Sequence, residues 1–173
     1  MRSTIKIVIL LFFICTSMSG ASFPDMEKYM RQHALIWEQL PMQWNEGAFL
    51  GNGLVGMMVY ADSTLNALVF HLGRPDVTDH RKAPYRKTSI GTEEADKMVD
   101  FCRLDVGKML LFPEGKILLG TFYLDIYNAE LTGHLKTDKG DLTFHAYTPQ
   151  PEEVNIVEVS SGVPYRWKGI PGN

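Results

Sequence analysis

Hydrophobic and polar residues alternate along much of the second half of the chain, and this period of two predicts β-strands. The clearest run is KILLGTFYLDIY at 116–127. ELTGHLKTD and DLTFHAYT flank Lys139-Gly140, so residues 130–148 are predicted to form a hairpin. In the run 116–127, the face expected to be buried carries Leu118, Phe122, Leu124 and Ile126, and the other face carries Tyr123, Asp125 and Tyr127.

Further strands are predicted at 54–60, 64–72, 108–112 and 154–160. The first of these is apolar at consecutive positions, which favours a central strand covered on both faces. Pro113-Glu114-Gly115 has the composition of a turn, because proline presets φ and glycine accepts a positive φ. About seven strands with short connections predict a mainly β fold, an antiparallel β-sandwich.

Two short helices are expected beside the strands. Apolar and aromatic residues recur every three or four positions in 25–40, with Asp25 as the N-cap and Pro41 as the stop. A second pattern covers 93–103, with Thr92 as its N-cap. Cys102 lies on the apolar face of that second helix and is expected in the core.

The first 21 residues have the organisation of a secretory signal peptide. Arg2 and Lys6 precede the apolar run IVILLFFIC, which is too short to span a bilayer, and Ser19-Gly20-Ala21 supplies small residues for cleavage. We therefore expect cleavage after Ala21, a domain at 22–173, and a periplasmic or extracellular location. Cleavage would leave one cysteine and so exclude an internal disulfide.

Charge excludes one class of partner and leaves several open. Removal of residues 1–21 leaves 15 of the 17 basic residues against 20 acidic ones, a formal charge of −5. The chain has no basic stretch of the kind that binds nucleic acid. After cleavage, no segment that would hold the protein in a membrane is expected, and a mildly acidic exported protein suits neutral substrates or polymers.

A glycine-rich loop precedes the first predicted strand. It contains Gly51, Asn52, Gly53 and Gly56, and neither a helix nor a lysine follows it as in a phosphate-binding loop. We expect a structural turn, in which glycine allows positive φ and Asn52 bonds the backbone two residues on. Trp44 and Glu46, just before this turn, are expected to be exposed.

The segment HALIWEQLPMQWNEGAFLGNGLVGMMVY, residues 33–60, resembles the N-terminal signature of family-95 glycoside hydrolases, the α-L-fucosidase and α-L-galactosidase group. A second block, at 115–148, resembles a later meander of the same family, although Tyr123 stands where the family often has arginine. The matching residues are His33, Trp44, Gly47, Leu50, Gly51, Asn52, Gly53, Leu54, Gly56, Leu124, Asp125, Ile126 and Ala129.

This resemblance implies an architecture in which an N-terminal β-super-sandwich precedes a helical linker and a catalytic (α/α)6 barrel. The chain would be the incomplete front part of that sandwich, a fragment without the barrel. Its function would be that of the non-catalytic N-terminal domain of a secreted glycoside hydrolase acting on α-linked L-fucosides or L-galactosides. The glycan substrate would be bound through the missing barrel, with no catalytic residue, cofactor or metal on this chain.

Candidate chemistry outside that resemblance centres on the loop 71–81. The loop contains His71, Arg74, Asp76, Asp79, His80 and Arg81. Its carboxylate and guanidinium groups can make paired hydrogen bonds to vicinal sugar hydroxyls, and we expect His71, Arg74 and Asp76 to bind substrate together with Trp44 and Glu46. The alternatives are a metal site made of the His and Asp side chains of this loop, and a solvated loop of weak ion pairs. His134 and His145, on the hairpin, are expected to be surface residues.

Two other functions remain open. A free-standing secreted carbohydrate-binding module would need an aromatic platform, for which the candidates are Trp37, Trp44, Tyr85 and Trp167. A small catalytic domain would need two carboxylates from Glu46, Asp76 and Asp79 on either side of a glycosidic bond. No sequence motif supports a nucleophilic serine.

Overall fold

The structure is a computed structural model that describes residues 25–78 and 103–172. The chain divides after His33, and each part is described by itself. The expected signal peptide lies outside the described residues. The helical pattern 93–103 also lies outside them, except for its last residue, and so do Asp79, His80, Arg81, Tyr85 and Cys102.

The first part contains the short helix α2, Met26–Arg31. The Asp25 side chain accepts a 3.2 Å hydrogen bond from the Lys28 N–H, so the predicted N-cap is confirmed. The helix is much shorter than predicted, because Gln32 is its C-cap and Leu35–Trp37 form strand β1 instead. Within the described residues, no helix is both long and apolar enough to cross a membrane.

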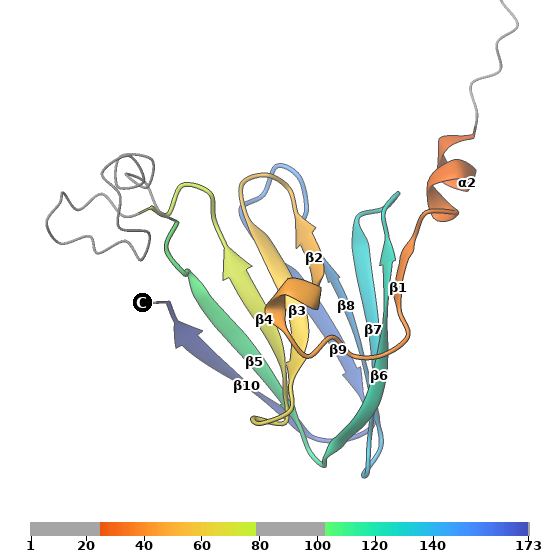
Figure 1. Ribbon diagram of the computed structural model, residues 1–173, viewed down its shortest axis with the longest axis vertical. Coiled ribbons are helices and arrows are strands. Elements are labelled where there is room, and N and C mark those ends of the chain that lie inside the picture. The colour runs from red at the N-terminus through yellow and green to blue at the C-terminus, as the bar shows by residue number, and fades with distance from the viewer. Residues whose placement is uncertain (1–24, 79–102, 173) are drawn as a thin grey trace, which may run out of the picture. The chain divides into compact units, whose positions relative to one another are not determined.

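The second part is an antiparallel sandwich of two five-stranded sheets, which confirms the predicted fold class (Figure 1). Sheet A has the order β1-β6-β7-β8-β9, and sheet B has the order β10-β5-β4-β3-β2. Sheet A adds to β1 the strands β6 Ile117–Asp125, β7 Glu130–Thr137, β8 Asp141–Tyr147 and β9 Ile156–Ser161. Sheet B consists of β10 Tyr165–Pro171, β5 Gly107–Pro113, β4 Ala67–Gly73, β3 Gly56–Asp62 and β2 Ala48–Gly51.

The core lies between the inner faces of the two sheets. Phe144 of β8 packs edge to face against Phe70 of β4 and against Phe122 of β6, with ring centroids 5.4 and 5.5 Å apart. These aromatic contacts, together with aliphatic side chains from both sheets, form one cluster. The predicted hairpin 130–148 is confirmed, and Leu131 and Leu135 of its first strand point into this cluster.

Strand β6 departs from its predicted alternation at its start. The register with β7 shifts between Ile117 and Leu119, so Leu118, expected to be buried, is 56% exposed. Asp125 lies on the outer face as predicted, because it pairs with Glu130 while Leu124 and Leu131 point into the core, yet it is only 7% exposed. Its carboxylate accepts hydrogen bonds from the N–H groups of Tyr127 and Asn128, at 2.9 and 3.2 Å, in the turn to β7. The prediction for Leu118 was therefore wrong.

Strand β3 is internal as predicted, because it pairs with β2 and β4. It begins two residues later than expected, at Gly56, and Leu54 is exposed before it. Its inward residues are buried, whereas Met58 and Tyr60 on the outer face are only half-buried. The predicted cover is therefore full on the inner face of this strand and only partial on its outer face.

Candidate functional site

The glycine-rich loop is a structural turn held by Asn52. Its side-chain oxygen accepts hydrogen bonds from the N–H groups of Leu54 and Val55, at 3.0 and 3.1 Å. Gly53 has a φ of +90°, the left-handed conformation that favours glycine. Gly51 pairs with Gly56 across the strands, and a Cβ at Gly56 would lie 2.8 Å from the Leu50 oxygen. The Asn52 bond to the backbone two residues on and the positive φ of Gly53 are as expected, and the turn joins β2 to β3.

Asn52 also ties the turn to the other sheet. Its side-chain amide donates to the main-chain oxygens of Pro149 and Glu152, at 2.8 and 2.7 Å. The side chain of Gln150 donates in return to the Asn52 oxygen at 2.7 Å. These atoms join the β2–β3 connection of sheet B to the β8–β9 connection of sheet A. The polar groups of Asn52 are therefore occupied within the chain rather than free for a ligand.

Trp44 and Glu46 lie in the 3-10 turn η1, Trp44–Glu46, which leads into β2. Trp44 is 62% exposed, as predicted. The Glu46 side chain is exposed, and its main-chain oxygen accepts a 2.9 Å hydrogen bond from the Trp37 indole. This contact joins the start of sheet A to the turn and leaves the Trp44 side chain open to solvent.

His71 faces outward on β4 and is paired with Asp105. The His71 Nε2 and Asp105 Oδ1 atoms are 2.8 Å apart, and the same carboxylate oxygen accepts a 3.0 Å bond from the Gly107 N–H. Partial burial raises the pKa of Asp105, but the hydrogen bonds from His71 and Gly107 outweigh it and lower that pKa overall. His71 therefore stabilises the start of β5.

Arg74 holds two carboxylates at the end of β4. It binds Asp76 through two hydrogen bonds of 2.9 and 2.8 Å, and it binds Glu153 at 2.7 Å. These hydrogen bonds raise the pKa of Arg74, and its guanidinium lowers the pKa of Asp76. Because Glu153 belongs to the connection between β8 and β9, the ion pair bridges the two sheets.

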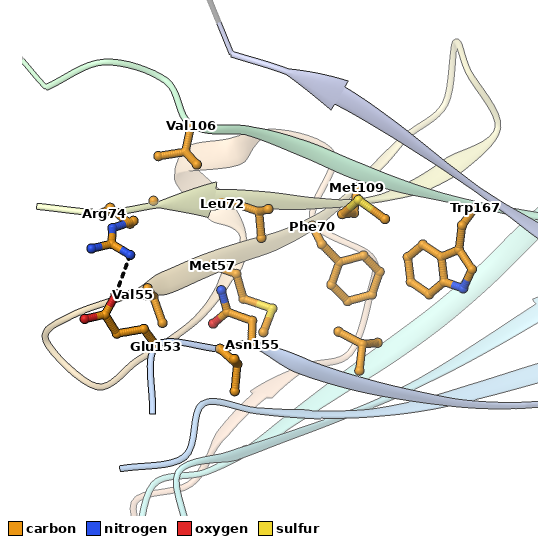
Figure 2. Close-up of a pocket in the computed structure, with 13 residues that line it drawn as sticks. Val55, Met57, Phe70, Leu72, Arg74, Val106, Met109, Glu153, Asn155 and Trp167 are labelled. Atoms are coloured by element: carbon orange, nitrogen blue, oxygen red, sulfur yellow. Dashed lines mark hydrogen bonds and ion pairs between the residues drawn. The ribbon is translucent and has the colours of Figure 1, made fainter. Parts of the chain in front are cut away.

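Arg74 and Glu153 stand at one end of an apolar cleft of about 670 Å³ between the sheets. Figure 2 shows Trp167 beside Phe70 at the other end of this cleft, with Asn155 between. Sheet B supplies most of the walls, and β9 supplies Val157. From the sequence, Trp167 was predicted only as one of four aromatic residues of a possible sugar-binding platform. Glu153 was not predicted at all, because it and its partner Arg74 are 79 residues apart in the sequence.

The five predicted substrate-binding residues do not form one site. Arg74 and Asp76 are together at the cleft, His71 faces outward from sheet B, and Trp44 and Glu46 lie at the β2 end of that sheet. The aromatic residues predicted as a sugar-binding platform are also apart, because Trp37 and Trp167 belong to edge strands of different sheets. In the described parts of the chain, no group of His, Cys, Asp and Glu side chains could hold a metal ion.

The outer faces of the two sheets differ in chemistry. On the outer face of sheet A, His145 contacts Glu130 and Glu158 at 3.2 and 3.3 Å, and His134 lies 3.7 Å from Asp141. The β1 and β6 side of the same face carries the exposed apolar side chains Ile36, Leu119 and Tyr123. These histidines are the cross-strand surface residues predicted. The outer face of sheet B across β2 to β5, here called the sheet B outer face, carries Phe49, Met58, Tyr60, Val69, Leu110 and Phe112 together with His71 and Lys108.

The registers place the apolar residues of the sheet B outer face on neighbouring strands, with His71 between Met58 and Lys108. Phe49 pairs with Met58, Tyr60 pairs with Val69, and Val69 pairs with Leu110. Val69 and Leu110 are each 2% exposed yet lie outside the core cluster, whereas Phe49 is 55% exposed. Met58, Tyr60 and Phe112 are half-buried, so Phe49 is the exposed large apolar side chain of this face. The residues of the face come from four strands, so no single segment of the sequence predicts it.

Comparison with known proteins gives no match to a family model and none to a curated protein. The family therefore stays a prediction made from the residues of the two sequence blocks.

Proposed function

We propose that this chain is the non-catalytic β-sandwich of a secreted glycoside hydrolase resembling family 95, and that it supports a separate catalytic barrel. The observation that carries the proposal is the sheet B outer face. Phe49 is exposed there beside the half-buried Met58. We infer that a second domain covers this part of sheet B.

The neighbourhood of Trp44 supports the same assignment. The resemblance places the contact with the next domain just before the glycine-rich turn, where Trp44 is exposed. Phe49, five residues further on, is exposed on the sheet B outer face. Exposed Trp and Phe side chains are the type that becomes buried in domain interfaces.

The distribution of carboxylates supports a non-catalytic role. Glycoside hydrolysis needs two carboxyl groups facing each other across the bond to be cleaved. Asp76 is occupied by Arg74, and Glu46 lies in η1, on a different part of the sandwich from the cleft. The substrate class, an α-linked L-fucoside or L-galactoside, comes from the resemblance alone.

An assay of the isolated chain tests this proposal. We expect no hydrolysis of aryl α-L-fucosides or aryl α-L-galactosides, under conditions in which the barrel encoded by the same gene or gene cluster is active. Turnover by the purified chain that is lost in both Glu46→Gln and Asp76→Asn would overturn the proposal. The absence of any barrel-encoding sequence in that gene cluster would also overturn it.

Secretion is part of the proposal and has its own test. If residues 1–21 are a signal peptide, the exported protein begins near Ser22, and its intact mass is that of residues 22–173. A full-length mass in the soluble exported fraction would contradict this part.

A further inference from the structure

Strand β10 and its neighbour β5 carry a row of positive charge on their outward side. Arg166 and Lys168 of β10 pair with outward-facing residues of β5, so their side chains also point outward. Lys108 of β5, opposite Ile170, lies on the same face. The whole chain is acidic, with a formal charge of −3, so these two strands differ in charge from the rest of the molecule.

The three cations of this row are not neutralised by the described chain. None of them makes an ion pair or a side-chain hydrogen bond within the described residues. The carboxylates before and after β5 are already engaged. Asp105 pairs with His71 at 2.8 Å, and Glu114 pairs with Lys139 at 2.6 Å. The row is therefore open to acidic groups from outside the described chain.

Arg166 is held in position at this row. Its guanidinium lies over the Phe112 ring, 4.1 Å from the ring centroid. This cation–π contact fixes the charge on the outer face, while no described oxygen accepts from its N–H groups. An acidic side chain arriving there would meet a positioned cation.

The outer edge of β10 is also free. The strand ends the order of sheet B and is bonded to β5 alone, and all seven of its residues are exposed (Figure 1). Along its other side, backbone N–H and C=O groups have no partner strand in the described chain. Pro171, the residue of the strand that lacks an N–H, is its last. Cations on this edge disfavour basic strands and favour acidic ones, because like charges directly opposite each other destabilise a strand pair.

The inward side of β10 calls for apolar neighbours. Tyr165 and Trp167 alternate with the two cations of the strand and are 42% and 37% exposed. Trp167 packs on Phe70, with ring centroids 5.4 Å apart, and lines the apolar cleft. A strand added beside β10 would place every second side chain next to these two aromatic residues and the others next to Arg166 and Lys168.

Charge and alternation together define the ligand. We propose that the free edge of β10 binds an extended polypeptide segment of another protein, in which acidic residues alternate with apolar ones. The acidic residues lie beside Arg166 and Lys168, and the apolar residues cover Tyr165 and Trp167. This proposal is independent of the assignment to a glycoside hydrolase.

A capped peptide of alternating valine and glutamate is the probe, and its matched control has lysine in place of glutamate. We expect the valine–glutamate peptide to bind more tightly, with an affinity that weakens as salt is added, and to protect the backbone amides of 165–170 from hydrogen exchange. A central proline in this peptide should remove the protection, because proline breaks the pairing. Equal affinities for the two charged peptides in fluorescence anisotropy, or binding without protection of β10, overturns the proposal.

Charge reversal on the strand tests the role of the cations. Lys168→Glu should weaken the valine–glutamate peptide about threefold or more and strengthen the valine–lysine peptide. Lys136→Glu makes the same change on the exposed face of β7 in sheet A and should leave both affinities unchanged. An unchanged preference in Lys168→Glu, or an equal shift in Lys136→Glu, overturns the proposal. If Lys168→Glu does not fold, the comparison of the two peptides on the wild type decides the matter alone.

Two other occupants would give different results. If dextran sulfate binds the wild type and the valine–glutamate peptide does not, the row is a site for acidic polysaccharide and the proposal fails. If light scattering shows a dimer whose 165–170 amides are protected without peptide, the occupant is a second copy, and the proposal also fails.

Discussion

The side chain of Gln150 and the main chain of Asn52 are joined by a 2.7 Å hydrogen bond across the end of the sandwich. The Asn52 side chain donates two hydrogen bonds to the same β8–β9 connection, to the main-chain oxygens of Pro149 and Glu152. One asparagine in a tight turn of sheet B therefore fixes the position of the segment that enters β9.

Asn52→Ala should lower the free energy of unfolding by about 2 to 4 kcal/mol, at roughly 1 kcal/mol for each lost hydrogen bond. Asn52→Asp keeps the acceptor of the turn but points a carboxylate at two carbonyl oxygens. We expect it to be at least as destabilising as alanine at neutral pH and less so in acid. Gln150→Ala, which removes one bond, is the control at about 1 kcal/mol. Urea unfolding measures all three.

Gly53→Val should destabilise the protein by more than about 1 kcal/mol. A Cβ at Gly53 meets no atom within 4 Å, so the loss comes from its φ of +90° and not from a clash. Gly73 is the matched control, because its Cβ position is equally open and its φ is not in the left-handed region. Gly73→Val should stay within about 0.5 kcal/mol of wild type. Equal effects in thermal unfolding would refute this explanation.

The stability of the fold should fall in acid through Asp105. Its pKa is lowered in the folded state, so the unfolded chain binds more protons between the two pKa values. The stabilisation is present above the ordinary carboxyl pKa of about 4 and is lost as pH falls through the lowered value.

Asp105→Asn keeps an acceptor for the Gly107 N–H but removes this titration. We therefore expect the variant to be less stable than wild type at pH 7 and to lose less stability on acidification. Chemical unfolding across the acidic range measures the difference, and parallel curves for the two proteins would rule out this role for Asp105.

Local sequence signals predicted most of the fold. The hairpin around Lys139-Gly140 was found because turn residues separate two alternating strands, and the Asp25 cap because capping is local. Strand β1 was assigned to a helix because its aromatic residue continued a helical spacing, while its pairing partner β6 lies more than 80 residues further on. Strand β10 was missed because glycine and proline interrupt its alternation.

The candidate site was less predictable than the fold. Arg74 and Asp76 are two residues apart, and the sequence grouped them correctly. Glu153 and Trp167 are brought to the same cleft as Arg74 by the packing of the two sheets. Their distance from Arg74 along the sequence does not predict that packing. His71 was grouped with the loop by sequence distance, but strand alternation turns its side chain to the outer face, toward Asp105.

The central claim is the proposed association with a catalytic barrel, and its most direct measurement is the affinity of the chain for a barrel found in the same gene or gene cluster, determined by titration calorimetry. Phe49→Lys places a charge on the sheet B outer face and should weaken the complex about tenfold or more. Thr143→Lys makes the same change on the polar outer face of sheet A and should leave the affinity unchanged. No measurable complex with wild type, or equal affinities for the two variants, would contradict the account.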